Sequence, residues 1–244
     1  MAIAHQTTTA AGGAPAMLGA NGMPQPQAWW FDPASVELAA QSVQSGGRGS
    51  AWFVHGPFGD GVLRHYRRGG AMAKLSQDRY LWGGEERVRS VAELRLLDAL
   101  QERGLPVPPP IAAAWWRDGA TYRAAILVAT IPDTHTLASE LSAGVENENG
   151  WRDAGAMIAS FHATGLEHGD LNTHNILFDA ARKPWLIDFD KSRLHAKPDR
   201  RRVDANLARL ERSIHKVGAG QSPTYLQRVI DTLRAGYRSQ GEQA

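Results

Sequence analysis

The spacing of apolar residues changes along the chain, and each pattern predicts a different element. Apolar residues recur at every third or fourth position over residues 86–103, which predicts a helix that ends before Gly104 and Pro106. Residues 121–130 form a short, nearly continuous apolar run and predict a buried strand. Residues 46–66 alternate glycine clusters with β-prone runs, which favours an antiparallel hairpin.

The order of these patterns predicts the domain organisation. Residues 1–27 are rich in Ala, Gly, Thr, Gln and Pro without periodicity, and we expect them to form a disordered tail. Strand patterns dominate residues 28–130, whereas residues 131–244 contain helical patterns such as that of residues 151–162. The sequence therefore predicts an α+β protein with a small β-rich N-lobe followed by a mostly helical C-lobe.

Composition narrows the class of protein. The chain has 244 residues, 43% of them hydrophobic, and can bury a substantial core. It contains no cysteine, which excludes disulfides and thiol nucleophiles and fits a reducing compartment such as the cytoplasm. We find no secretory signal and no apolar run approaching a membrane span, so any membrane contact is expected to be peripheral.

A dense group of polar residues lies between two apolar runs in the stretch HGDLNTHNIL, residues 168–177. Asp170 precedes Asn175 by five positions, and Asp188 follows the apolar residues 185–187. If residues 185–187 pair with residues 176–178 as a hairpin, the three polar side chains come together. Two of these side chains can supply oxygen ligands to a hard Mg²⁺ ion, while the separate carboxylate can accept a proton. A metal ion and a proton acceptor are the minimum that phosphoryl transfer needs.

The order and spacing of these residues resemble the protein-kinase-like fold, in which a loop H-x-D-L-x-x-x-x-N is followed by D-F-G or a variant. More narrowly, HGDL, DFD, GRGSAWFV and VLRHYRRGG resemble the 3-deoxy-D-manno-octulosonic acid (Kdo) kinases of Gram-negative bacteria over roughly residues 28–240. The resemblance implies a two-lobed kinase-like fold that uses ATP and Mg²⁺. It also implies phosphorylation of Kdo, at the 4-hydroxyl, on a Kdo-lipid A precursor of the lipopolysaccharide inner core.

The resemblance also implies roles for individual residues. Asp170 would be the catalytic base or hydroxyl positioner, Asn175 and Asp188 the Mg²⁺ ligands, and His168 a support of the loop. The residues that would cover the ATP phosphates belong to the glycine loop and are Gly46, Gly47, Gly49 and Ser50.

Two positions depart from the pattern of protein kinases. Where these enzymes have a phosphate-anchoring lysine, the best match is Arg64, and the nearest lysine downstream is Lys74. We favour Arg64, because strand alternation turns it the same way as Tyr66, and we expect Glu93 on the inward face of the helix to be its partner. The second departure is Asp190, which stands where protein kinases have glycine.

Basic residues gather close in sequence to the motifs and predict an anionic partner. They follow the anchor strand and the metal-ligand motif, at Arg67, Arg68, Lys191, Arg193, Lys197, Arg200, Arg201 and Arg202. Together with the resemblance, they predict a glycolipid acceptor and peripheral binding at the cytoplasmic face of the inner membrane. Tryptophans do not interleave with the basic run, so a nucleic-acid partner is not expected, and no obligate protein partner is evident.

Two alternatives remain open from the sequence. The acceptor could be a heptose, an aminoglycoside or a protein, since the motif carries the phosphoryl-transfer chemistry and leaves the acceptor unspecified. The chain could also be a pseudokinase that binds nucleotide without turnover, because Arg64 replaces the lysine and Asp190 the glycine. The presence of Asp170, Asn175 and Asp188 argues against the pseudokinase.

Overall fold

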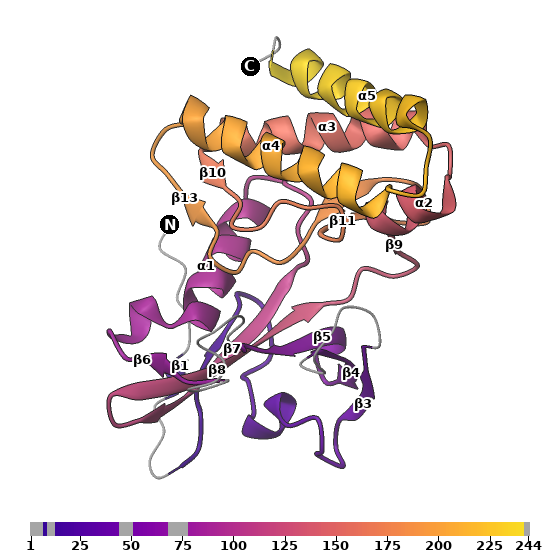
Figure 1. The fold of residues 1–244 in the computed structure, drawn as a ribbon. Helices are drawn as coiled ribbons and strands as arrows, with labels where there is room; N and C mark the ends of the chain where they lie inside the picture. The colour runs from indigo at the N-terminus through magenta and orange to yellow at the C-terminus, as the bar shows by residue number, and fades with distance from the viewer. Residues whose placement is uncertain (1–6, 9–12, 44–50, 68–77, 242–244) are drawn as a thin grey trace. The chain divides into compact units, whose positions relative to one another are not determined.

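The computed structural model describes residues 7–8, 13–43, 51–67 and 78–241 (Figure 1). It contains two compact units: Met1–Ala99 with Pro109–Thr130, and Leu100–Pro108 with Ile131–Ala244. Among the described residues, no helix is both long and apolar enough to cross a bilayer.

The first unit is built on one antiparallel sheet. Its strands are β1 (Thr7–Thr8), β2 (Ala16–Gly19), β3 (Ala39–Ser42), β4 (Ala51–Gly56), β5 (Gly59–His65), β6 (Tyr80–Leu81), β7 (Pro110–Asp118) and β8 (Thr121–Ala129). The spatial order is β1-β2-β7-β8-β5-β4-β3, and β6 pairs separately with β8. Two short 3-10 helices, η1 (Ala28–Phe31) and η3 (Glu85–Arg87), and the helix α1 (Arg89–Gln101) complete the fold.

The predicted hairpin is confirmed and consists of β4 and β5. These strands pair from Ala51 opposite Arg64 to Gly56 opposite Gly59. Gly59 has a φ of 88°, a left-handed conformation that glycine adopts without steric cost, so the chain can reverse within two intervening residues. Strand β3 pairs antiparallel with β4. The glycine segment that connects β3 to β4 in the sequence, residues 46–50, lies outside the described residues.

The expectation of a disordered tail over residues 1–27 is wrong for part of that segment. Residues Ala16–Gly19 form β2, which lies between β1 and β7 in the sheet and pairs with both. Leu18 is fully buried and Met17 is 8% exposed. A run of four residues is too short to show a period in the sequence, but here the sheet supplies both backbone partners and an apolar surface to cover.

The predicted helix over residues 86–103 is confirmed as α1, with its first turn shortened by η3. Val91, Leu94 and Leu97 are buried, as their spacing predicted. Gly104 has a φ of 72°, and its N–H donates to the carbonyl of Gln101, which ends the helix where glycine can take a left-handed conformation.

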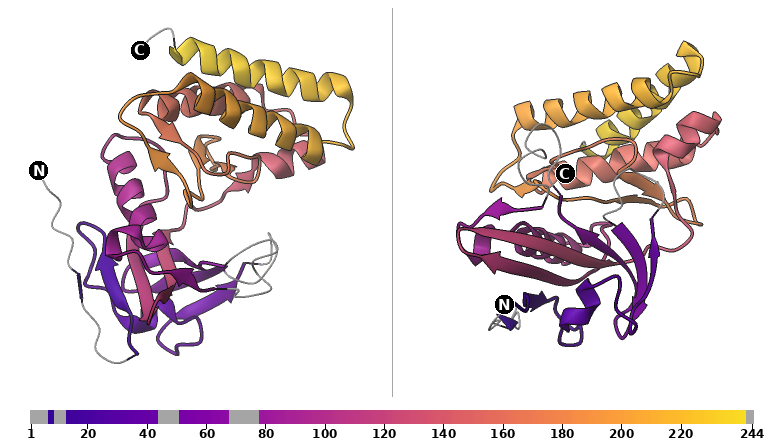
Figure 2. Two further views of the ribbon diagram at one scale, coloured as in Figure 1. Left: turned by 60° about the vertical axis from the view of Figure 1, so that its left-hand side comes forward. Right: turned by 60° about the horizontal axis from the view of Figure 1, so that its bottom comes forward.

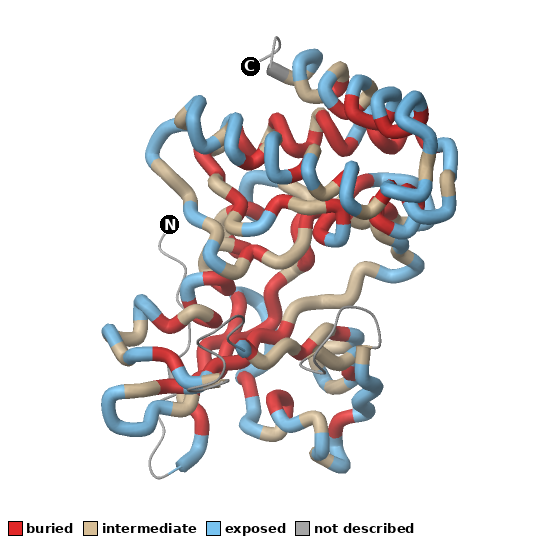
Figure 3. Tube along the Cα trace, viewed as in Figure 1, coloured by how far each residue is buried: buried red, intermediate tan, exposed pale blue. Residues whose placement is uncertain are grey.

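The core of the first unit lies against the sheet and joins residues that are distant in sequence. Trp30 and Phe31 of η1 are each 1% exposed and belong to the same apolar cluster as Leu63 of β5 and Leu127 of β8. The aromatic rings of η1 therefore pack with side chains of β5 and β8, which follow η1 in the sequence. Figure 3 shows the buried stretches of β7 and β8 in red.

The second unit is mainly helical. Its helices are α2 (Leu137–Ala143), α3 (Glu148–Ala163), α4 (Arg200–Val217) and α5 (Pro223–Gly241). Its short strands are β9 (His135–Thr136), β10 (Leu166–Glu167), β11 (Ile176–Phe178), β12 (Pro184–Leu186) and β13 (Arg193–Leu194). The α+β prediction is thus confirmed by a β-rich first unit and a helical second unit.

Helices α3 and α5 approach so closely that two glycines are required between them (Figure 2). A Cβ added to Gly155 would lie 2.0 Å from the carbonyl oxygen of Leu233, and one added to Gly236 would lie 1.8 Å from that of Arg152. Because these neighbours are backbone atoms, they cannot move aside at low cost. The two helices therefore pack backbone against backbone at these positions.

Candidate active site

Residues 168–175 of the HGDLNTHNIL stretch form a loop between β10 and β11 in the second unit, its last two residues belong to β11, and Asp188 follows β12. The predicted hairpin is confirmed, because β11 and β12 pair antiparallel from Ile176 opposite Leu186 to Phe178 opposite Pro184. One further bond, from the N–H of Ile187 to the carbonyl of Asn175 at 3.0 Å, extends the ladder toward the polar ends of both strands. Residues 13 positions apart therefore meet because two short strands pair.

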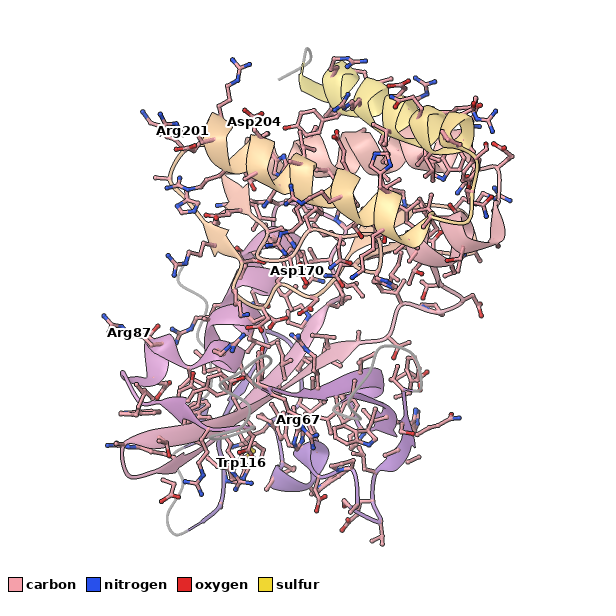
Figure 4. All side chains as sticks on the ribbon, viewed as in Figure 1. Arg67, Arg87, Trp116, Asp170, Arg201 and Asp204 are labelled. Atoms are coloured by element: carbon pink, nitrogen blue, oxygen red, sulfur yellow. The ribbon has the colours of Figure 1, made fainter. Side chains whose placement is uncertain are left out.

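Asn175 is nearly buried and is oriented by the loop itself. Its Nδ2 donates to the backbone carbonyl of Asp170 at 2.9 Å. Since the amide nitrogen is used in this way, the side-chain oxygen is the atom that can bind a cation. The same bond ties the end of the loop to Asp170, whose side chain is half exposed and whose position is labelled in Figure 4.

His168 links the loop to the segment before Asp188. It is 2% exposed, and its Nε2 lies 3.2 Å from the carbonyl oxygen of Ile187, while the N–H of Asp170 donates to its Nδ1 at 3.2 Å. Burial lowers the pKa of His168, although the nearby Asp188 carboxylate acts in the opposite direction. A neutral imidazole with the proton on Nε2 satisfies both contacts, so His168 supports both loops and needs no charge.

The backbone around Asp188 has an uncommon conformation. Asp188 has a φ of 61°, in the left-handed region that non-glycine residues enter at a cost of about 1–3 kcal/mol. Gly169 packs directly on the following loop, since a Cβ there would lie 2.7 Å from the carbonyl oxygen of Asp190. The N–H of Gly169 also donates to Ser192 Oγ at 3.0 Å. The loop of Asp170 and the loop of Asp188 therefore fit together at backbone distance.

Sequence reasoning missed that helix α4 holds the loop of residues 168–175. Asn206 is 7% exposed, accepts the N–H of His168 at 3.0 Å and donates to the carbonyl of His168 at 3.1 Å. Ser213 lies two turns further along α4, where it accepts the N–H of Thr173 at 3.1 Å. The available signal was the position of Asn206 in the buried stripe with Leu210, since a polar residue among buried apolar ones needs partners.

Between these two contacts α4 places a cation against Asp170. Nη1 of Arg209 lies 2.6 Å from Oδ1 of Asp170, and the two side chains are 49% and 52% exposed. Residues Asn206, Arg209 and Ser213 share one face of α4 because they follow helical spacing. No pattern in the sequence indicated that Arg209, 39 positions after Asp170, would be its neighbour.

The first unit contains the predicted inward pair. Nη2 of Arg64 lies 2.6 Å from both Oε1 and Oε2 of Glu93, whose side chain is 5% exposed, so the predicted partnership is confirmed. The hydroxyl of Tyr66 donates to Oε2 of Glu93 at 2.5 Å. The described residues do not include the predicted nucleotide-covering loop, which consists of Gly46, Gly47, Gly49 and Ser50. The alternative anchor, Lys74, also lies outside them.

The side chains of the second unit suit magnesium better than softer metals. Within the described ranges no group of three or more His, Cys, Asp or Glu is arranged to hold a metal ion. The predicted ligands are instead one carboxylate, Asp188, and one carboxamide, Asn175. Mg²⁺ is commonly held by one or two protein oxygens together with substrate phosphates and water, so this oxygen-only set fits it.

The basic stretch before and within α4 is partly neutralised. Asp199 caps the helix by accepting the N–H groups of Arg201 at 2.9 Å and Arg202 at 3.2 Å. Arg202 also lies 3.4 Å from Glu167, whereas the Arg200 side chain is 94% exposed and lies 3.9 Å from Asp204. Arg201 projects away from the amino end of α4, as Figure 4 shows.

Comparison with known proteins gives a consistent family assignment. The model of the lipopolysaccharide kinase (Kdo/WaaP) family matches residues 34–237. The 3-deoxy-D-manno-octulosonic acid kinase of Stenotrophomonas maltophilia strain K279a is 49% identical over 210 residues, covering 85% of this chain and 82% of the relative. Proteins of the same name from Xylella fastidiosa strain M12 and Xanthomonas campestris pv. campestris strain B100 are 47% and 45% identical, covering 86% and 87% of this chain and 81% and 85% of the relatives.

The family match covers most of both units and includes the loop of residues 168–175, the hairpin and the Arg64–Glu93 pair. The β-rich first unit and the helical second unit correspond to the small and large lobes of a kinase-like fold, as the motifs predicted. The chain therefore belongs to the lipopolysaccharide kinase (Kdo/WaaP) family.

Proposed function

We propose that this protein is an ATP-dependent 3-deoxy-D-manno-octulosonic acid kinase that phosphorylates the Kdo sugar of a Kdo-lipid A precursor, at its 4-hydroxyl. The observation that carries the proposal is the arrangement around Asp170, which His168 and Asn175 hold beside the segment leading to Asp188. The names of relatives that are 45–49% identical over most of the chain support the same activity.

In the proposed reaction the acceptor hydroxyl attacks the γ-phosphorus of ATP, a new P–O bond forms, the bond to the β-phosphate oxygen breaks and ADP leaves. Asp170 orients the hydroxyl and receives its proton, as a half-exposed carboxylate at the end of a supported loop can do. Asn175 and Asp188 would hold Mg²⁺, which supplies neutralisation of the phosphate charge when bound.

Residues of the first unit are proposed to bind the nucleotide. Arg64 is three-quarters buried and oriented by Glu93, so its guanidinium has a defined direction before ATP arrives. A planar guanidinium can hold two phosphate oxygens at once, which makes Arg64 a suitable replacement for a lysine anchor. Gly46, Gly47, Gly49 and Ser50 are proposed to cover the phosphates, and Lys74 is the alternative anchor.

The proposed acceptor also implies a location. A Kdo-lipid A molecule resides in a membrane, so we propose that the protein binds peripherally to the cytoplasmic face of the inner membrane. The exposed side chains of Arg200 and Arg201 support this, because each basic group near an anionic surface contributes about 1 kcal/mol at low salt. Neither a nucleic acid nor an obligate protein partner is part of the proposal.

The test is transfer from γ-labelled ATP, with Mg²⁺ present, to a panel of acceptors: Kdo-lipid A, a heptosylated core, an aminoglycoside and a protein. We expect label on the Kdo acceptor, and fragmentation of the product should place the phosphate on the 4-oxygen of Kdo. Label on the heptose, aminoglycoside or protein alone would assign another acceptor within this fold. Nucleotide binding without transfer to any acceptor would indicate a pseudokinase.

A further inference from the structure

Arg209 forms an ion pair with Asp170, and the proposed role of Asp170 as proton acceptor does not require a cation at this position. Both side chains are about half exposed, and such pairs contribute little to stability because water screens them. The position of Arg209 therefore points to a role in binding.

Helix α4 fixes where the guanidinium can reach. Asn206 on one side of Arg209 binds the backbone of His168, and Ser213 on the other binds Thr173, so the helix is attached to the catalytic loop both before and after Asp170. Arg209 leaves the same face of α4 between these contacts. The backbone of Arg209 is therefore held in place, even though its guanidinium is exposed.

The guanidinium retains unused hydrogen-bonding capacity. A guanidinium has five N–H donors, and Arg209 uses Nη1 for Asp170. The other donors of Arg209 make no hydrogen bond to any residue in the described part of the chain. The guanidinium of Arg209 can therefore bind a second anion with its remaining donors while it stays bonded to Asp170.

We infer that Arg209 binds the carboxylate of the acceptor sugar and holds it beside Asp170. The inference rests on the proposed function, because the sugar acid named in the relatives carries a carboxylate on the same ring system as the hydroxyl to be phosphorylated. Two carboxylates brought together repel each other unless a cation lies between them. Arg209 supplies that cation, and by fixing the carboxylate it selects which hydroxyl of the sugar faces Asp170.

The inference assigns Arg209 to specificity for the acceptor, separate from handling of ATP. An acceptor whose carboxyl group has been reduced to a primary alcohol keeps the hydroxyl that reacts but loses the charge. The parent protein is expected to prefer the carboxylate acceptor over the reduced one by about 10- to 100-fold in kcat/KM, the range for a hydrogen bond between charged groups.

The test compares the parent, Arg209→Gln and Arg209→Lys on Kdo-lipid A and its carboxyl-reduced form. Arg209→Gln should bring the preference close to one, chiefly through a higher KM for the carboxylate acceptor, and Arg209→Lys should recover part of it. Arg212→Gln is the matched control: it makes the same charge change on an exposed side chain one turn along α4 and should keep the parent's preference. Thermal unfolding midpoints of the Arg209 variants should stay within about 3 °C of the parent.

Each other outcome overturns the inference in a recognisable way. If Arg209→Gln keeps the parent's preference, the acceptor carboxylate is bound elsewhere. If it slows both acceptors equally and raises the KM for ATP, the guanidinium acts on the transferred phosphoryl group. If the parent phosphorylates both acceptors equally well, the carboxylate is not recognised, although the kinase function stands. If the parent phosphorylates no Kdo acceptor, the proposed function itself fails.

Discussion

Asn206 of α4 makes two hydrogen bonds to the backbone of His168, which lies 38 residues earlier in the chain. His168 in turn bonds the backbone of Asp170 and lies within hydrogen-bonding distance of the carbonyl of Ile187, immediately before Asp188. A side chain outside every recognised motif therefore determines where the motif residues stand. The consequence is that the geometry of the loop of residues 168–175 depends on the packing of α4.

Replacing Asn206 with Ala should damage both stability and turnover. Two buried backbone groups of His168 would lose their partner, at a cost of about 1–3 kcal/mol for each group that stays unsatisfied. We expect the unfolding midpoint in denaturant to fall and kcat to drop by about tenfold or more, with a smaller change in the KM for ATP. Ala205→Ser, on the exposed face of the same turn, is the control and should change neither quantity appreciably. Normal kcat in Asn206→Ala would show that α4 does not position the loop.

Asp170→Asn should abolish nearly all transfer while leaving the protein folded. The amide has nearly the same shape, but it cannot accept the proton of the hydroxyl, so kcat should fall by about a hundredfold or more. The dissociation constant for ATP, measured by calorimetry in the presence of Mg²⁺, should change little. Asp188→Asn should differ by weakening Mg²⁺-dependent ATP binding as well. Similar kinetics for both variants and the parent would remove Asp170 from its proposed role.

Arg64→Ala should raise the KM for ATP by about tenfold and lower kcat, since it removes the proposed phosphate anchor. It also leaves the carboxylate of Glu93, 5% exposed, without the guanidinium that neutralises it, so the protein should be less stable. Glu93→Gln should give a milder rise in the KM for ATP. Lys74→Ala is predicted to have a smaller effect than Arg64→Ala, and the opposite ranking would move the anchor to Lys74.

The buried histidine His162 should make the protein less stable in mild acid. Burial lowers its pKa from the usual 6.5 to about 4. Between those values the unfolded chain binds a proton that the folded protein does not, so this part of the stability is complete above pH 6.5 and is lost as the pH falls toward 4. The shift corresponds to about 3 kcal/mol.

Denaturant unfolding at pH 7 and pH 4.5 measures this effect. His162→Gln removes the titrating group while keeping a side chain able to bond Tyr237 or Asn206, which bind its two ring nitrogens. The variant should be less stable at pH 7 but should lose less stability on acidification than the parent. An equal loss in the two proteins would assign the acid sensitivity to other groups, among them His168.

Arg200 and Arg201 should contribute to membrane binding but should not stabilise the folded protein. Both lie at the amino end of α4, where the helix dipole disfavours positive charge. Replacing both with Ser should weaken sedimentation with anionic vesicles, and added salt should imitate the double variant. The thermal midpoint should stay equal or rise slightly. Arg202 is left unchanged because it pairs with Glu167 and Asp199.

The parts of the site that sequence could predict are those that depend on local pattern. Helix α1 follows from periodicity, and the β11–β12 hairpin follows from two short apolar runs that adjoin the polar motif residues. The Arg64–Glu93 pair follows from which face of a strand and a helix turns inward. Strand β2 could not be predicted, because its four residues are stable only as part of the sheet. Arg209 could not be placed either, because its contact with Asp170 depends on the docking of α4, a long-range packing event without a local signal.

The most direct test of the account is phosphate transfer from γ-labelled ATP to purified Kdo-lipid A by the parent protein and by Asp170→Asn in parallel. The account predicts that the parent forms a singly phosphorylated product whose phosphate lies on the 4-oxygen of Kdo, and that the variant forms about a hundredth as much or less while still binding ATP. Equal product from the two proteins, or no product from a folded parent that binds ATP, would contradict it.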